Sequence, residues 1–169
     1  MKTWDHDQRI LVVLAHPDDP EFFCGATIAK WVIEGNHVFY LLLTRGEKGI
    51  NDFFNPKDID EIIKTRTQEQ ENAARILGVD QVQYLHEPDG YLSPDILVRR
   101  KVVRVIREVK PDIVVTCDPT NYYLQDTRIN HPDHRAAGQI TIDSVFPAVQ
   151  NQAFYSDLAI NGHLYPHQI

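Results

Sequence analysis

The sequence is poor in cysteine, in positive charge and in long apolar runs, and each shortage excludes a class of protein. Cys24 and Cys117 are its two cysteines, too few for a disulfide framework or a thiolate zinc site. Its 17 lysines and arginines against 24 acidic residues leave a net charge of −7. We therefore expect no nucleic-acid partner, because phosphate binding needs a basic footprint. No apolar run approaches the roughly 18 residues of a membrane span.

What the chain does contain is enough apolar sequence for a core, together with many histidines. It has 169 residues, of which 43% are hydrophobic, so we expect one domain over residues 1–169 that needs no disulfides. Residues 1–7 are polar and unlike a signal peptide, and the expected location is therefore the cytoplasm. Eight residues are histidine, the commonest metal ligand, so their positions become the main question.

Short apolar runs alternate four times with amphipathic segments. The predicted strands are residues 10–15, 37–43, 82–85 and 113–117, and the predicted helices are residues 25–34, 58–77, 94–109 and 133–146. Strands that are apolar throughout are typical of parallel sheets covered by helices on both faces. The sequence therefore predicts an α/β fold, a three-layer αβα sandwich with a mainly parallel, Rossmann-like sheet. Ligands of such sheets bind at the carboxyl ends of the strands.

The first chemically informative segment follows the first predicted strand. His16, Asp18 and Asp19 lie within four residues there, in the sequence Ala-His-Pro-Asp-Asp-Pro-Glu. His16 and Asp19 are close enough in sequence to share one metal ion from a tight turn, with Asp18 beside the metal. The alternative is a solvated turn with an N-capping aspartate, since polar turns with proline and aspartate are common.

The second segment, residues 130–135, leaves the fourth predicted strand and enters a helix. His134 can complete a set with His16 and Asp19, which is the catalytic zinc pattern of three protein ligands and an open position for water. The alternative is an N-capping Asp133 flanked by two surface histidines. One such segment alone is weak evidence for a metal site. Two are strong evidence, because a parallel sheet brings both loops to the same edge.

The two motifs together resemble the LmbE-like, or PIG-L-type, zinc de-N-acetylases, which act on N-acetylglucosamine conjugates. Further matching positions are residues 44–49, Arg66, Glu69 and residues 77–78, in the family's order along nearly the whole chain. The resemblance implies that zinc, with iron(II) as the alternative metal, is bound by His16, Asp19 and His134.

The resemblance also implies roles for the other site residues. Asp18 would be the general base, and His131 would steady the oxyanion and could protonate the leaving amine. Asp133 would orient His131 through its carboxylate. Arg66 and Asp89 match positions that line the substrate pocket of the family.

The function implied by the resemblance is hydrolytic removal of an acetyl group from a small N-acetylglucosamine-type conjugate. One alternative is a zinc amidase that acts on another N-acyl or thiol conjugate. An alternative of another class is a non-catalytic α/β module that binds a small molecule or nucleotide. The Gly-x-Gly-x-x-Gly pattern is absent after the first strand, which weakens the nucleotide alternative.

Family members usually continue beyond the histidine-bearing helix with a further strand and helix. Residues 144–169 show no such pattern, so we expect a short C-terminal part that lacks this segment. The expected metal positions are all present, whereas the wall that selects the substrate would be incomplete. An exposed sheet edge would also favour a homo-oligomer, because its backbone groups are unpaired.

Overall fold

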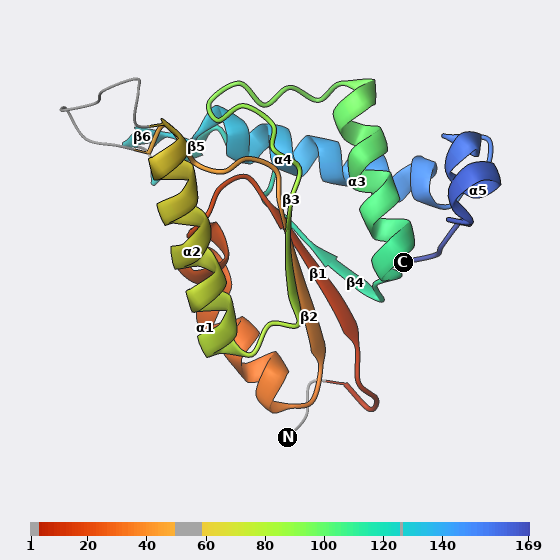
Figure 1. Cartoon of the computed structure of the whole chain (residues 1–169), viewed down its shortest axis with the longest axis horizontal. Helices are drawn as coiled ribbons and strands as arrows, with labels where there is room; N and C mark the ends of the chain where they lie inside the picture. Colours follow the sequence, from red (N-terminus) through yellow and green to blue (C-terminus); the bar gives the residue numbers. More distant parts are fainter. Residues whose placement is uncertain (1–3, 50–58, 126) are drawn as a thin grey trace.

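The computed structural model describes residues 4–49, 59–125 and 127–169, and its centre is a four-stranded parallel sheet in the order β3-β2-β1-β4 (Figure 1). The strands are β1 (Arg9–Leu14), β2 (His37–Leu42), β3 (Gln81–Tyr84) and β4 (Ile113–Val115). The helices that flank the sheet are α1 (Asp19–Ile33), α2 (Ile59–Leu77), α3 (Ile96–Val109) and α4 (Pro132–Asp143).

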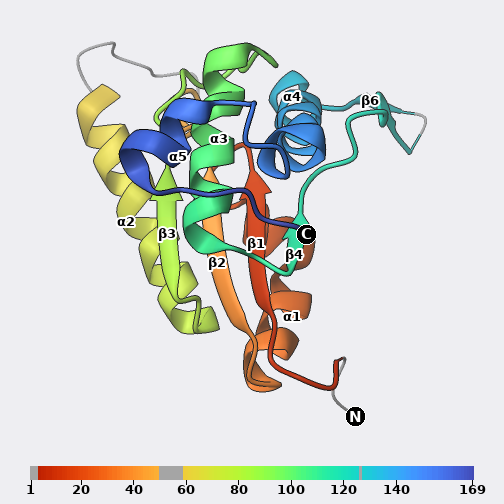
Figure 2. The ribbon, with the colours of Figure 1, turned by 90° about the vertical axis from the view of Figure 1, so that its right-hand side faces the viewer.

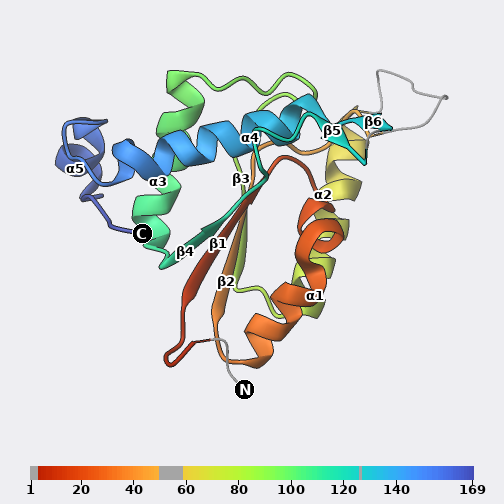
Figure 3. The same cartoon turned by 180° about the vertical axis from the view of Figure 1, so that it is seen from behind.

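Alternate residues of β1 point into two separate cores. Ile10, Val12 and Leu14 belong to the core beneath α1 and α2, whereas Leu11 and Val13 belong to the core beneath α3 and α4. Figures 1 and 3 view the molecule from opposite directions, and both show α1 and α2 on one face of the sheet and α3 and α4 on the other. This arrangement confirms the predicted three-layer α/β fold.

The first helix begins earlier than predicted, directly after the His-Pro-Asp-Asp motif. The predicted range began at residue 25, but α1 starts at Asp19 and includes a kink at Cys24, where φ is −145°. Pro20 suits the first turn of a helix because its missing N–H would have no partner there. The motif therefore forms the tight connection between β1 and α1.

Two further regions differ from the prediction. The stretch between the predicted strand at residues 113–117 and the predicted helix at residues 133–146 contains a short antiparallel pair, β5 (Tyr123–Leu124) and β6 (Arg128–Ile129). The helix predicted to reach residue 146 ends as α4 at Asp143 and continues as a π-helical segment, η2 (Ser144–Val149). Residue 58, the first residue of the predicted helix at 58–77, and residues 50–57 before it lie outside the described residues.

The C-terminal segment, including α5 (Ser156–Gly162), packs near α3 (Figure 2). Arg107 of α3 is fully buried and donates hydrogen bonds to the carbonyls of residues 148, 149, 151 and 154. One side chain therefore ties the sheet-covering helix to the segment that follows α4. Among the described residues, no helix combines the length and apolar character needed to cross a membrane.

Candidate metal centre and active site

A cavity of about 610 Å³ lies where the loops after β1 and β3 meet the start of α4. Seven of the eight predicted site residues line it: His16, Asp18, Asp19, Arg66, Asp89, His131 and His134. The eighth, Asp133, is buried and contacts His16. The sheet thus brings together the two motifs that are more than 100 residues apart in the sequence.

Asp19 joins the two histidines that are predicted to share a metal with it. One carboxylate oxygen, Oδ2, lies 3.4 Å from Nδ1 of His16, and the other, Oδ1, lies 3.2 Å from Nε2 of His134. Asp19 is buried, which alone would raise the pKa of its carboxyl. The contacts with His134 and His16 outweigh that effect and hold the pKa of Asp19 well below its usual range.

His16 is surrounded by carboxylates on both ring nitrogens. Its Nε2 lies 3.1 Å from Oδ1 of Asp89 and 3.2 Å from Oδ2 of Asp133, so this nitrogen donates to acceptors that cannot themselves donate. Burial alone would lower the pKa of His16, but the hydrogen bonds to Asp133, Asp19 and Asp89 raise it to about 11. Nδ1 is left facing Asp19, the second predicted ligand.

His134 is oriented by Asn130, the buried residue at the start of the same motif. Nδ1 of His134 lies 3.3 Å from Oδ1 of Asn130. The Nδ2 of Asn130 donates to the carbonyl of Asn121, so its Oδ1 is the atom that faces the histidine. Nδ1 of His134 therefore donates to Asn130, and Nε2 is the ring nitrogen that faces Asp19.

The donor set of His16, Asp19 and His134 fits a small divalent cation. Two ligand atoms that are each about 2 Å from a tetrahedral zinc ion are about 3.3 Å apart. Each oxygen of Asp19 lies at about this spacing from one histidine nitrogen, Oδ2 at 3.4 Å from His16 and Oδ1 at 3.2 Å from His134. Imidazole and carboxylate ligands are also those that zinc takes in catalytic sites.

Two overlapping groups in the described residues bring three ligand atoms within 4.8 Å of one another. One consists of His16, His131 and His134, and the other consists of His16, Asp89 and Asp133. His16 belongs to both groups, and Asp19 contacts two members of the first. The centre is therefore a continuous patch of ligand atoms with His16 in its middle.

Asp133 does not orient His131 through its carboxylate, as the sequence had led us to expect. Its carboxylate instead contacts His16 and accepts the backbone N–H groups of Gly90 and Leu92, at 2.7 and 3.2 Å. The physical reason is its position in the first turn of α4, where its carboxylate reaches the backbone N–H groups of the loop after β3. Asp133 thus links that loop to His16.

His131 caps the start of α4, where its Nδ1 accepts the backbone N–H of Asp133 at 3.2 Å. The neutral ring then carries its proton on Nε2. Burial and the positive charge of His16 lower the pKa of His131, and the ring centres of the two histidines are 4.8 Å apart. His131 lines the cavity and is thus placed to donate a hydrogen bond from Nε2.

Asp18 lies at the mouth of the cavity in an unusual backbone conformation. Its φ is 80°, the left-handed region, and its side chain is 72% exposed. Arg66 from α2 donates to Oδ2 of Asp18 at 3.1 Å and to the carbonyl of Pro17 at 3.0 Å. The carboxylate is therefore accessible to a ligand yet held by a neighbouring cation.

Arg66 and Asp89, predicted to line the substrate pocket, do line the cavity, and both already have protein partners. The guanidinium of Arg66 packs closely against Gly46, where φ is +65° and an added Cβ would lie 2.6 Å from Nε. Asp89 accepts the backbone N–H of Lys48 at 2.7 Å. Their contact with a substrate remains a proposal.

Three residues that the structure places at the site have no role in the predictions made from the sequence. Asn130 holds His134, and Phe23 packs edge-on against the same ring, with the ring centres 5.3 Å apart. Gln70 contacts the backbone of Asp18. The spacing of Gln70 from Arg66, one helical turn within a predicted helix, is a signal that could have indicated a shared face.

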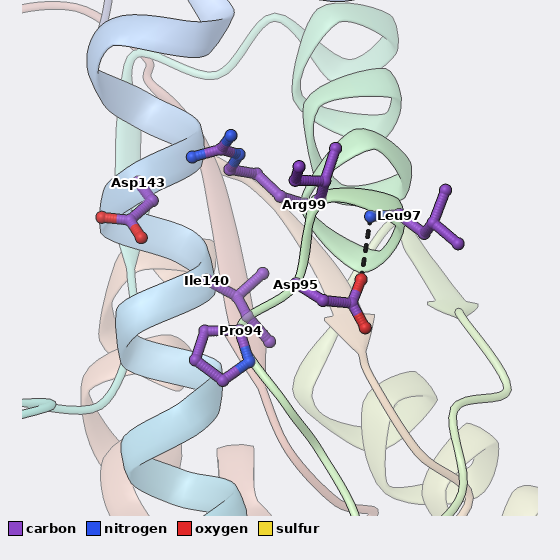
Figure 4. A pocket seen from close by; sticks show the side chains of 7 residues that line it. Pro94, Asp95, Leu97, Arg99, Ile140 and Asp143 are labelled. Carbon is purple, nitrogen blue, oxygen red and sulfur yellow. Dashed lines mark hydrogen bonds between the residues drawn. The ribbon is translucent and has the colours of Figure 1, made fainter.

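A second hollow, of about 490 Å³, lies between α3 and α4 (Figure 4). Its acidic side chains are Asp95, which caps α3 by accepting the N–H groups of Leu97 and Val98, and Asp143. Its lining residues include no histidine. The chemistry of this hollow is therefore that of a helix terminus, and we place the functional site at the larger cavity.

Comparisons with known proteins identify the family of the chain. The family described as PIG-L: GlcNAc-PI de-N-acetylase matches residues 11–145. A diacetylchitobiose deacetylase from Thermococcus kodakarensis is 36% identical over 162 residues, which are 96% of this chain and 57% of that protein. A 1D-myo-inositol 2-acetamido-2-deoxy-alpha-D-glucopyranoside deacetylase from Kineococcus radiotolerans is 32% identical, over 84% of this chain and 46% of that protein.

Among solved structures, the N,N′-diacetylchitobiose deacetylase from Pyrococcus horikoshii, complexed with its inhibitor MPG, superposes with a TM-score of 0.85. It is 31% identical in sequence, and the match covers 96% of this chain and 57% of that one. The chain thus spans about half the length of the curated relatives it matches.

Proposed function

This chain belongs to the PIG-L family of GlcNAc-PI de-N-acetylases, and from that membership we propose that it is a metal-dependent hydrolase that removes the acetyl group from an N-acetylglucosamine conjugate. The observation that carries the proposal is the bridge that Asp19 forms between His16 and His134, inside the same cavity as Asp18 and His131. The named relatives act on acetylated glucosamine compounds, which gives the substrate class.

His16, Asp19 and His134 would hold the metal, which we propose to be zinc. When bound, zinc supplies Lewis acidity toward the acetyl carbonyl and acidifies water. Asp89 and Asp133 fix the ring of His16 through Nε2, and Asn130 fixes His134 through Nδ1. These contacts keep the ligand atoms aimed at one point.

Asp18 is the proposed general base because its carboxylate is next to the ligand set and open to the cavity. It takes a proton from the attacking water as the bond to the amide carbon forms. His131 donates from Nε2 to the carbonyl oxygen, where negative charge develops. The departing amine then receives a proton from Asp18 or from His131.

Metal-dependent acetate release tests this proposal. The protein is stripped with a chelator, reloaded with zinc or iron(II), and assayed on N-acetylglucosamine, N,N′-diacetylchitobiose and a set of N-acyl compounds without a sugar. We expect acetate release from the sugars, and we expect it to need the metal. Release from the non-sugar amides alone would indicate a different amidase, and a chain that neither binds nor responds to metal would indicate a binding module.

A further inference from the structure

Gln70, in the middle of α2, is a buried polar residue that lies against the proposed catalytic base. It is 2% exposed. Its Oε1 accepts the backbone N–H of Asp18 at 2.6 Å, and its Nε2 lies 3.1 Å from each carboxylate oxygen of Glu21. A carboxylate can only accept, so the amide nitrogen must face Glu21 and the amide oxygen must face Asp18.

The contacts continue into the sheet. The hydroxyl of Tyr40, a core residue of β2, donates to Oε1 of Glu21 at 3.4 Å. The chain of contacts therefore runs from β2 through Glu21 and Gln70 to the backbone of Asp18. Each member comes from a different part of the fold, and both the oxygen and the nitrogen of the Gln70 amide have hydrogen-bond partners.

Asp18 needs such support because of its backbone conformation. A φ of 80° is unfavourable for a residue with a side chain and persists where the surroundings impose it. The carbonyl of Asp18 accepts the N–H of Phe22 at 2.9 Å, which starts α1, and Gln70 holds the N–H on the other side. On the N-terminal side of Asp18, Gln70 holds the N–H of the Pro17–Asp18 peptide group and Arg66 holds its carbonyl, so loss of the Gln70 contact would leave this peptide group held by Arg66 alone.

We propose that Gln70 is a positioning residue for the hydrolysis: it fixes the backbone of Asp18, and thereby the direction from which the base meets the water. This inference rests on the proposed function of Asp18. Arg66 holds the carboxylate of Asp18 and the carbonyl of Pro17, whereas Gln70 holds the N–H of Asp18 and does not contact the carboxylate. The two contacts are therefore separable by substitution.

The variants separate the acceptor of Gln70 from its packing. Gln70→Leu removes both polar contacts, and Gln70→Lys keeps a donor for Glu21 but offers no acceptor to Asp18. The double variant Glu21→Gln with Gln70→Glu exchanges the two partners and restores the acceptor. Gln68→Leu is the matched control, because Gln68 lies on the same helix, is exposed and contacts Asn72.

Three measurements are made on each folded variant: kcat and KM for acetate release, metal bound per chain, and hydrogen exchange of the Asp18 amide by NMR. We expect Gln70→Leu and Gln70→Lys to lower kcat by about 10- to 100-fold, the size of a small misplacement of a reacting group, with KM and metal content unchanged. Exchange of the Asp18 amide should be at least about tenfold faster in both. The double variant and Gln68→Leu should behave like the wild type.

A wild-type kcat in Gln70→Lys, or an Asp18 amide that exchanges equally fast in all variants, would overturn the inference. If Gln70→Leu does not fold, Gln70→Lys and the double variant still decide it. If the wild type releases no acetate from any sugar, the proposed function fails, and the exchange rates alone then test whether Gln70 holds Asp18.

Discussion

Arg107, which is fully buried, and His16, whose side chain is 12% exposed, are both basic groups, but different acceptors surround them. Arg107 is fully buried, and the hydrogen-bond partners described for it are backbone carbonyls that follow α4. His16 lies within 3.4 Å of three carboxylates, those of Asp19, Asp89 and Asp133. Carbonyls supply dipoles, whereas carboxylates supply full charges.

The difference explains why one centre is structural and the other is suited to a metal. At Arg107 a permanent cation satisfies neutral acceptors, and the result is a fixed joint between α3 and the C-terminal segment. At His16 three negative charges meet one imidazole, which leaves negative charge that a divalent cation can neutralise. Changes at the first centre should therefore affect stability, and changes at the second should affect chemistry and metal binding.

The largest expected effect is the loss of turnover when Asp18, in the proposed active site, is replaced. Asp18→Asn keeps the shape of the side chain but removes the base, so we expect kcat to fall by about 10²- to 10⁴-fold. Metal content and the midpoint of thermal unfolding should stay near those of the wild type, because Asp18 is exposed. Steady-state acetate release measures kcat, elemental analysis measures the metal content, and a thermal melt measures the midpoint of unfolding. Wild-type turnover by this variant would show that Asp18 is not the base.

The reverse pattern is expected at Arg107. Arg107→Met leaves several buried carbonyls without a donor, and we expect the free energy of unfolding to fall by about 3 kcal/mol. Metal affinity and kcat, measured well below the unfolding temperature, should be unchanged because the side chain lies away from the cavity. Urea unfolding measures the free energy of unfolding. A selective loss of metal binding would show that the two centres are coupled, against our account.

Asp133→Asn sharpens the comparison within the metal centre. The amide can still accept a backbone N–H, but it removes one of the charges beside His16. We expect metal affinity to fall by about 10- to 100-fold, the usual cost of losing an outer partner of a histidine ligand. Competition with a chelating dye measures this. Unchanged affinity would mean that Asp133 serves only to hold the loop at Gly90 and Leu92.

The smallest effect is expected at the hollow in Figure 4. Asp95→Ala removes the cap of α3 and should lower the free energy of unfolding by about 1 kcal/mol. Metal binding and kcat should not change, because Asp95 lines a cavity without histidine. Chemical denaturation measures the free energy of unfolding, and the acetate assay measures kcat. Loss of activity in a stably folded variant would mean that this hollow takes part in the reaction.

The sequence predicts the fold well where hydrophobic burial alone decides it. Residues 10–14 are apolar throughout because helices cover both faces of β1, and that pattern is visible without any structure. The C-terminal segment was not predicted, because its packing depends on Arg107 reaching carbonyls more than 40 residues away. Contacts of that kind leave no periodic pattern.

The same limit applies to the candidate site. Sequence spacing brings His16 and Asp19 together, since a tight turn leaves few alternatives. It could not show that Asp133 faces His16 rather than His131, because that depends on how α4 enters the cavity beside the loop after β3. Gln70 was missed for a related reason: a polar residue in a polar helix shows its burial only once α1 has packed against it.

The central claim is that the metal lies between His16, Asp19 and His134. Crystals soaked in zinc, with anomalous data collected on either side of the zinc absorption edge, locate the ion directly. Our account predicts an anomalous peak within about 2.1 Å of His16 Nδ1, an Asp19 oxygen and His134 Nε2. A peak on the opposite side of the ring, among His16 Nε2, Asp89 and Asp133, would contradict it.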